Sequence, residues 1–156
     1  MRKLALVAML VLLAMPAIAG MPITPSAFKV ESRQVMWFAF RVTERLAKVE
    51  GRFESRGGSD NRIRCLILDQ ENLDNLKNEQ PMRAYYDSGS VVVANVSARL
   101  ARGDYFVVFD NREGWLTSRS VWSNIQLNPS RTSGGIEGTA GSMRFCPVVR
   151  RYQSRN

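Results

Sequence analysis

The sequence predicts an all-β fold, an antiparallel, jelly-roll or related sandwich of seven to eight strands with one short helix. Short alternating or apolar segments recur along the chain, and turns rich in Gly, Asn and Asp separate them. Helical periodicity is confined to residues 70–78, where Leu73 and Leu76 are three apart and Asp69 is a candidate N-cap. Because most consecutive strands are joined by short turns, the sheets are expected to be antiparallel.

The individual strands are assigned from alternation or from runs of β-forming residues. Residues 46–55 alternate small or apolar with charged side chains, which is typical of a strand with one face in the core and one in water. Residues 104–110 are an aromatic and branched run that follows a predicted turn at 102–103. The other expected strands are 35–43, 62–69, 90–99, 118–127 and 143–149.

The first nineteen residues have the pattern of a secretory signal peptide. Arg2 and Lys3 precede an apolar run over 4–15, and Ala17 and Ala19 are small residues at positions −3 and −1 of a cleavage site. The apolar run is shorter than the ~20 residues that a membrane-spanning helix needs. We therefore expect cleavage after Ala19, and a mature chain that lies in the periplasm or is secreted and has no transmembrane segment.

Composition divides the rest of the chain into three parts. Residues 20–27 are an extended lead-in, residues 28–127 form the sandwich, and residues 128–156 are a Gly- and Ser-rich linker with a basic C-terminal segment. The chain has two cysteines, Cys65 and Cys146, and an even count in an exported chain favours a disulfide. Such a bond would tie the C-terminal segment to the sandwich. Two buried free thiols are the alternative.

The middle of the chain carries an ordered set of motifs: VEGRF at 49–53, GGSDN at 57–61, YYDSG at 85–89 and RGDYFVVFDN at 102–111. This order resembles the GOLD-like β-sandwich domain, the fold of the lumenal part of p24 cargo receptors. It resembles more loosely the pre-peptidase C-terminal domains of secreted proteases. The resemblance covers about residues 28–127 and implies a sandwich that mediates interactions and has no shared catalytic residues. The coiled coil and membrane anchor of the cargo receptors are not expected here, so their role is not carried over.

The absence of histidine narrows the chemistry of the chain. Without histidine there is no Ser-His-Asp or Cys-His arrangement and no His metal site, and two cysteines alone cannot make a four-ligand zinc site. Carboxylates at strand ends leave open a calcium site or a hydrolase pair, although Asp at such places is also typical of turns and caps. These carboxylates are Asp60, Asp69, Glu71, Asp87 and Asp110. We expect no metal, no cofactor and no enzyme activity.

Aromatic side chains near turns are the first candidates for binding residues. Tyr85 and Tyr86 precede a predicted turn at 87–89, and Trp115 lies in another turn, where an exposed Trp favours contact with a partner. Trp37 and Trp122 are assigned to the core because each lies within a strand.

Arginines of the C-terminal segment are the second candidates. Residues 128–156 contain five arginines, Arg150 and Arg151 among them, against one acid. The guanidinium fork binds carboxylates and phosphates. The formal net charge of +8 falls to +6 when Arg2 and Lys3 leave with the signal peptide.

These observations predict an exported, non-catalytic binding or adaptor domain of the cell envelope. Its expected partner is a protein or an anionic envelope component, either lipid or glycan, and not nucleic acid. A small secreted hydrolase that uses strand-end carboxylates, and an inhibitor of a secreted enzyme, are the alternatives.

Overall fold

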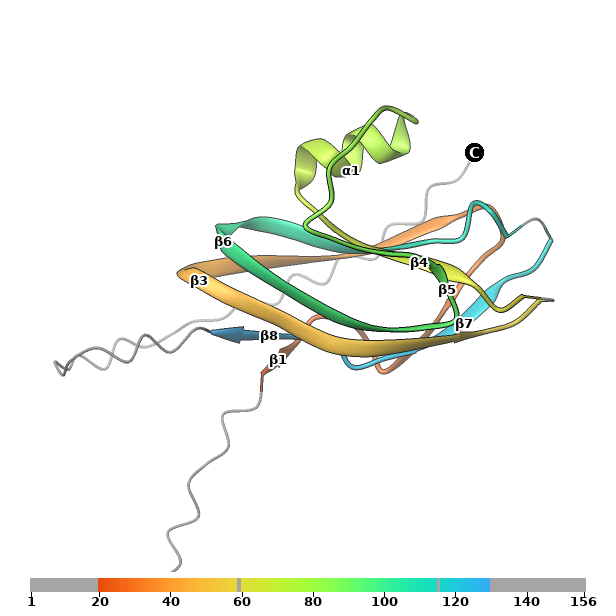
Figure 1. Ribbon diagram of the computed structural model, residues 1–156, viewed down its shortest axis with the longest axis horizontal. Coiled ribbons are helices and arrows are strands. Elements are labelled where there is room, and N and C mark those ends of the chain that lie inside the picture. Colours follow the sequence, from red (N-terminus) through yellow and green to blue (C-terminus); the bar gives the residue numbers. More distant parts are fainter. Residues whose placement is uncertain (1–19, 59, 115, 130–156) are drawn as a thin grey trace, which may run out of the picture.

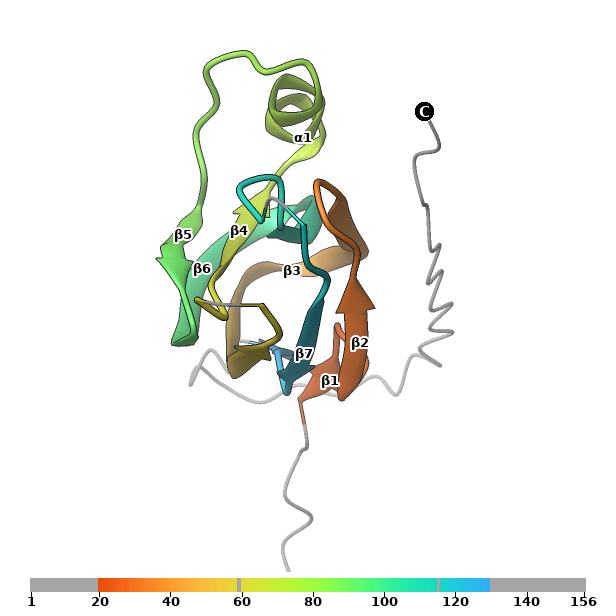
Figure 2. The same cartoon turned by 90° about the vertical axis from the view of Figure 1, so that its right-hand side faces the viewer.

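A computed structural model describes residues 20–58, 60–114 and 116–129 (Figures 1 and 2). This part of the chain is all-β: eight antiparallel strands, not closed into a barrel, with one helix, which confirms the predicted fold class. The elements are β1 Met21–Pro22, β2 Ala27–Val30, β3 Val35–Arg56, β4 Ile63–Leu68, α1 Gln70–Lys77, β5 Tyr86–Val91, β6 Val93–Asp110, β7 Arg119–Ser123 and β8 Gln126–Pro129.

Strands β3 and β6 form one long antiparallel ribbon that runs through both layers of the sandwich (Figure 1). A register shift between Val42 and Leu46 divides the ribbon in two. On one side of the shift, β6 continues to β4 and then β5, and we call this sheet the upper layer. On the other side, β3 continues to β7 and β8, which pair with β2 and β1, and we call this sheet the lower layer.

The upper layer is buried on both faces where α1 covers it. Its inner face packs into the main core between the layers, while its outer face packs under α1 through Leu66, Leu68 and Val108 (Figure 2). Leu73 and Leu76 of the helix fill this second cluster. Burial on both faces explains why 35–40, 65–68 and 105–109 are continuous apolar runs and not alternating ones.

The helix begins where the sequence predicts. The Asp69 carboxylate accepts a hydrogen bond from the Asn72 backbone N–H at 2.9 Å and so caps α1. At the other end, the Lys77 ammonium lies 4.3 Å from the ring centre of Trp37, which is half-buried beside the second cluster. The helix therefore covers the upper layer with its apolar face and presents charged residues to water.

The lower layer has one face in the core and one in water. Along β7 and the residues after it, Val121, Ser123, Ile125 and Leu127 point inward, as predicted. The outward residues between them are polar except Trp122, which is 45% exposed. The assignment of Trp122 to the core was therefore wrong, because a place within a strand does not decide which face a side chain takes.

Two predicted turns are also wrong. The chain does not turn at 102–103; instead β6 continues through them, and Gly103 pairs with Val42 of β3. Residues 87–89 lie within β5, opposite a register shift in β4, with Gly89 at φ +63°. In both places an irregularity bends a strand pair where glycine suggested a reversal of the chain.

Cys65 is fully buried in the main core and is a free thiol among the described residues. Burial raises the pKa of this thiol, which keeps it protonated and unreactive. Its predicted partner Cys146, and the predicted strand 143–149, lie outside the described residues. No helix of the described chain is long and apolar enough to cross a membrane.

Candidate functional site

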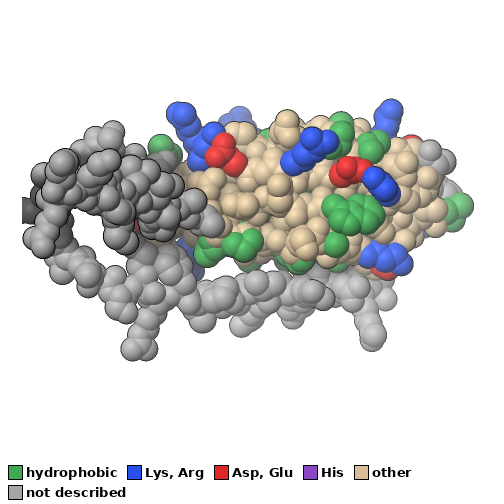
Figure 3. Space-filling view, turned by 90° about the horizontal axis from the view of Figure 1, so that it is seen from below, with side chains coloured by type: hydrophobic (Ala, Val, Ile, Leu, Met, Phe, Trp, Pro, Cys, Tyr) green, Lys and Arg blue, Asp and Glu red, His purple; other side chains and the backbone are tan. Residues whose placement is uncertain are grey.

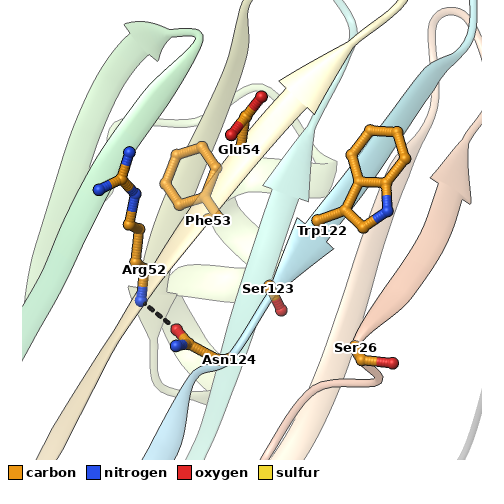
Figure 4. A pocket seen from close by; sticks show the side chains of 7 residues that line it. All are labelled: Ser26, Arg52, Phe53, Glu54, Trp122, Ser123 and Asn124. Carbon is orange, nitrogen blue, oxygen red and sulfur yellow. Dashed lines mark hydrogen bonds between the residues drawn. The ribbon is translucent and has the colours of Figure 1, made fainter.

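The outer face of the lower layer carries a shallow hollow of about 260 Å³ next to Trp122 (Figure 4). Phe53 and Ser123 are buried and form its floor, while the other lining residues are outward side chains of β3, β7 and the chain just before β2 and after β7. The lining residues are Ser26, Arg52, Phe53, Glu54, Trp122, Ser123 and Asn124.

Strand register fixes the place of Trp122. Trp122 lies opposite Glu54 of β3 on one side and opposite Ala27 of β2 on the other. The small Ala27 side chain leaves one flank of the indole open to solvent, whereas a large residue would cover it. Val121 and Ser123 point into the core, so the pleat of β7 sends Trp122 outward.

Charged side chains of β3 flank the indole. The Arg56 guanidinium lies 5.5 Å from the Trp122 ring centre and 2.9 Å from the Glu54 carboxylate. Glu54 is therefore engaged by Arg56. The Arg52 guanidinium forms no ion pair within the described ranges. Arg52 and Arg56 both lie on the outward side of β3, with Glu54 between them.

Asn124 holds the lower edge of the hollow in place. Its side-chain oxygen accepts a hydrogen bond from the Arg52 backbone N–H at 2.7 Å, and its own N–H donates to the Arg52 carbonyl at 3.0 Å (Figure 4). These two bonds hold the chain to β3 at Asn124, in the gap between β7 and β8, which each pair with β3. The Asn124 side-chain nitrogen has no hydrogen-bond partner among the described residues, so a ligand oxygen can accept a hydrogen bond from it.

The structure does not bring the sequence-predicted tyrosines to this hollow. Tyr85 packs edge-on against Tyr105 at 5.2 Å and donates to Asp69 at 3.2 Å, beside the start of α1. Tyr86 donates its hydroxyl to the Asn95 carbonyl at 2.9 Å and packs on the core. Burial raises the pKa of both tyrosines, and the neighbouring Asp69 carboxylate adds to this for Tyr85.

The remaining predicted binding residues, Trp115, Arg150 and Arg151, lie outside the described residues. Trp122 is the site residue that the sequence analysis missed. The signal was present, because the same alternation that placed Val121 and Ser123 inward requires Trp122 to point outward.

The strand-end carboxylates are separate and structurally engaged. Asp60 pairs with Arg119 at 2.7 Å, Asp87 with Arg64 at 2.5 Å, and Asp110 with Arg112 at 2.8 Å. Asp69 caps the helix and Glu71 lies in its first turn. Across the described chain no three Asp, Glu or Cys side chains come together in a group that could hold a metal ion.

Hydrogen bonding controls the pKa of two of these carboxyl groups. The Arg64 guanidinium lowers the pKa of Asp87 against the opposing effect of burial. For Asp69, burial raises the pKa, but hydrogen bonds from Asn72 and Tyr85 outweigh it and the net shift is downward. A general acid needs a pKa raised toward the working pH, whereas the pKa values of Asp69 and Asp87 are lowered.

In comparisons with known proteins, no family model matches this chain and no curated protein matches its sequence.

Proposed function

We propose that this chain is an exported, non-catalytic binding module of the cell envelope that recognises its partner through the outer face of the lower layer. The observation that carries the proposal is the exposed Trp122, which lies mid-sheet beside a shallow hollow and between charged side chains of β3. Exposed aromatic residues flanked by Arg are enriched where proteins bind partners.

The engagement of the strand-end carboxylates favours binding over hydrolysis. Asp60, Asp87 and Asp110 each form an ion pair with an arginine, so their carboxylate oxygens are engaged within the fold. A carboxylate-based hydrolase needs two acids that face a common substrate, with one pKa raised. The described acids have separate structural roles, and no two of them face a common substrate site, so they give no support to the alternative of a small hydrolase.

Export and the disulfide remain part of this proposal. The signal-like residues 1–19 motivate export, and oxidation of Cys65 with Cys146 would follow in an oxidising compartment. Because Cys65 lies wholly inside the main core, the bond would require Cys146 to enter the space between the layers. Peptide mapping under non-reducing conditions tests the bond, and two separate free-thiol peptides would exclude it.

The test of function is retention on purified envelope fractions. Trp122→Ala is expected to reduce the bound fraction at least about tenfold, because a central aromatic residue often contributes a large part of the binding free energy of an interface. Tyr85→Ala is the matched control, since Tyr85 is an aromatic residue that is 49% exposed against 45% for Trp122. It lies beside the start of α1 on the upper layer, away from the outer face of the lower layer. Equal retention of the wild type and Trp122→Ala would reject the proposal.

A further inference from the structure

Outward polar side chains extend the Trp122 site along the lower layer, with Val93, 42% exposed and opposite Glu54, as an apolar residue among them. Across the lower layer, Glu54 lies opposite Trp122, Arg52 opposite Asn95, and Lys48 opposite both Arg99 and Asn128. In Figure 3, which views the molecule from below, Lys and Arg lie near Asp and Glu, with hydrophobic side chains among them, over a surface largely of backbone and uncharged polar groups. We call the following set the polar face: Lys48, Glu50, Arg52, Glu54, Asn95, Ser97, Arg99, Trp122, Asn124, Gln126 and Asn128.

Both carboxylates of the polar face are already paired. Glu54 pairs with Arg56 at 2.9 Å, and Glu50 pairs with Lys48 and accepts from the Asn128 amide at 3.1 Å. The hydrogen bond from Lys48 lowers the pKa of Glu50 despite the opposing desolvation. Neither acid is therefore available to neutralise a further cation.

Two guanidinium groups on this face lack a carboxylate partner among the described residues. Arg52 and Arg99 are exposed and form no ion pair there. Arg99 lies directly across from Lys48, whose charge is already paired with Glu50. Arg52 and Arg99 are therefore the cations of this face that a ligand with carboxylate, sulfate or phosphate groups would complement.

Spacing suggests an extended ligand. Arg52 pairs with Asn95, four residues from Arg99 on β6, so the two cations are about 13 Å apart along the sheet. Amide side chains of Asn95 and Gln126 lie on the same face, where each offers donors and an acceptor. A ligand that reaches both arginines must carry anionic groups at intervals and hydrogen-bonding groups between them.

Resting on the proposed function, we infer that the ligand of the polar face is an acidic polysaccharide bearing carboxylates. The Trp122 indole stacks on the C–H face of one sugar, the amides bond hydroxyl groups, and the forks of Arg52 and Arg99 take carboxylates of separate sugars. Residues 20–129 carry 15 basic and 13 acidic residues, a net +2.

The test is affinity electrophoresis of the chain from residue 20 onward in gels containing polygalacturonate or, in parallel, its methyl ester. Polygalacturonate is expected to retard the protein at least about tenfold more strongly than the ester, which lacks free carboxylates. Trp122→Ala, and Arg52→Ala with Arg99→Ala, are each expected to weaken retardation at least about tenfold. Arg52→Lys with Arg99→Lys keeps both charges without the guanidinium fork and should restore only part of the retardation.

Arg62→Ala with Arg83→Ala is the charge-matched control, because it also removes two exposed arginines, one before β4 and one after α1, that are not part of the polar face. All variants keep residues 128–156, so the five arginines there contribute equally. Equal retardation by the acid and the ester, or equal weakening by the two double variants, overturns the polysaccharide inference. The binding module itself survives those outcomes if envelope retention still depends on Trp122, and fails only if it does not.

Discussion

Gly51 of β3 lies directly against the backbone of Ile125, where the chain passes from β7 to β8. A Cβ atom on Gly51 would come within 2.6 Å of the Ile125 Cα and 2.7 Å of the Asn124 carbonyl oxygen. Both are backbone atoms that are held by hydrogen bonds: the Ile125 carbonyl accepts from Ile23, and the Asn124 N–H donates to Arg52. This contact sets the spacing between β3 and the chain that follows β7.

Gly51→Ala is therefore expected to lower the free energy of unfolding by about 1–3 kcal/mol through steric overpacking. Gly89→Ala is the comparison, because a Cβ there meets nothing within 4 Å and only its φ of +63° is unfavourable. That strain is expected to cost about 1–2 kcal/mol. Urea denaturation of both variants measures the difference. A smaller loss for Gly51→Ala than for Gly89→Ala would contradict the packing argument.

The buried Arg119 is expected to be a major contributor to stability. Its guanidinium is 3% exposed and donates to the Arg62 carbonyl at 2.9 Å, to Thr117 Oγ1 at 2.5 Å and to Asp60 at 2.7 Å. Arg119→Met keeps the length but leaves these acceptors unpaired, and should cost about 3 kcal/mol. Asp60 is 56% exposed, so Asp60→Asn should cost below about 1 kcal/mol. Urea denaturation measures the unfolding free energy of both variants. Equal losses for Arg119→Met and Asp60→Asn would show that the Arg119–Asp60 ion pair, and not the other hydrogen bonds of Arg119, carries the stabilisation.

Asp69 is expected to stabilise α1 as its N-cap. Asp69→Ala removes the acceptor of the Asn72 N–H and the partner of the Tyr85 hydroxyl, and should cost about 1 kcal/mol. Asp69→Asn is the conservative control, because Asn caps helices about as well as Asp. Thermal unfolding followed by circular dichroism compares the two. An equal shift for both variants would indicate that the charge, and not the cap, matters.

The Asp87–Arg64 pair is expected to make stability depend on pH. The Arg64 hydrogen bonds lower the pKa of Asp87 in the folded state below its unfolded value. Such a group stabilises fully above its unfolded pKa of about 3.9 and loses this contribution as pH falls through the lower folded value. Asp87→Asn should therefore be less stable than wild type at neutral pH, and the gap should close in acid. Urea denaturation from pH 7 to 2.5 measures the gap, and a constant gap would argue against the linkage.

Alternation was sufficient to predict much of the fold. It located the lower-layer strands and their inward residues, as Val121 and Ile125 show. It could not assign faces in the continuous runs, because both faces of the upper layer are buried once α1 covers it. The turn predicted at Gly103 failed for a tertiary reason: β3 supplies a partner for both sides of that glycine, so the strand bends and continues.

The candidate site was less predictable than the fold. Local composition drew attention to Tyr85 and Tyr86, whose hydroxyl groups serve internal hydrogen bonds. The hollow beside Trp122 is assembled by register between β2, β3 and β7, which are far apart in the sequence. Cross-strand register is a long-range property, and no short motif encodes it.

The continuous ribbon of β3 and β6 also determines when the chain can fold. Val35 pairs with Asp110, and Glu54 pairs with Val93, so the ribbon joins residues that are 39 to 75 positions apart in the sequence. Loops of that length must be closed before their contacts stabilise anything, which makes folding slow relative to helical domains. During synthesis from the N-terminus, the second half of β3 therefore has no β6 partner until residues 93 onward have appeared, and the first half has none until residues 103–110 follow. The lower-layer half of the ribbon can thus begin to form before the upper-layer half.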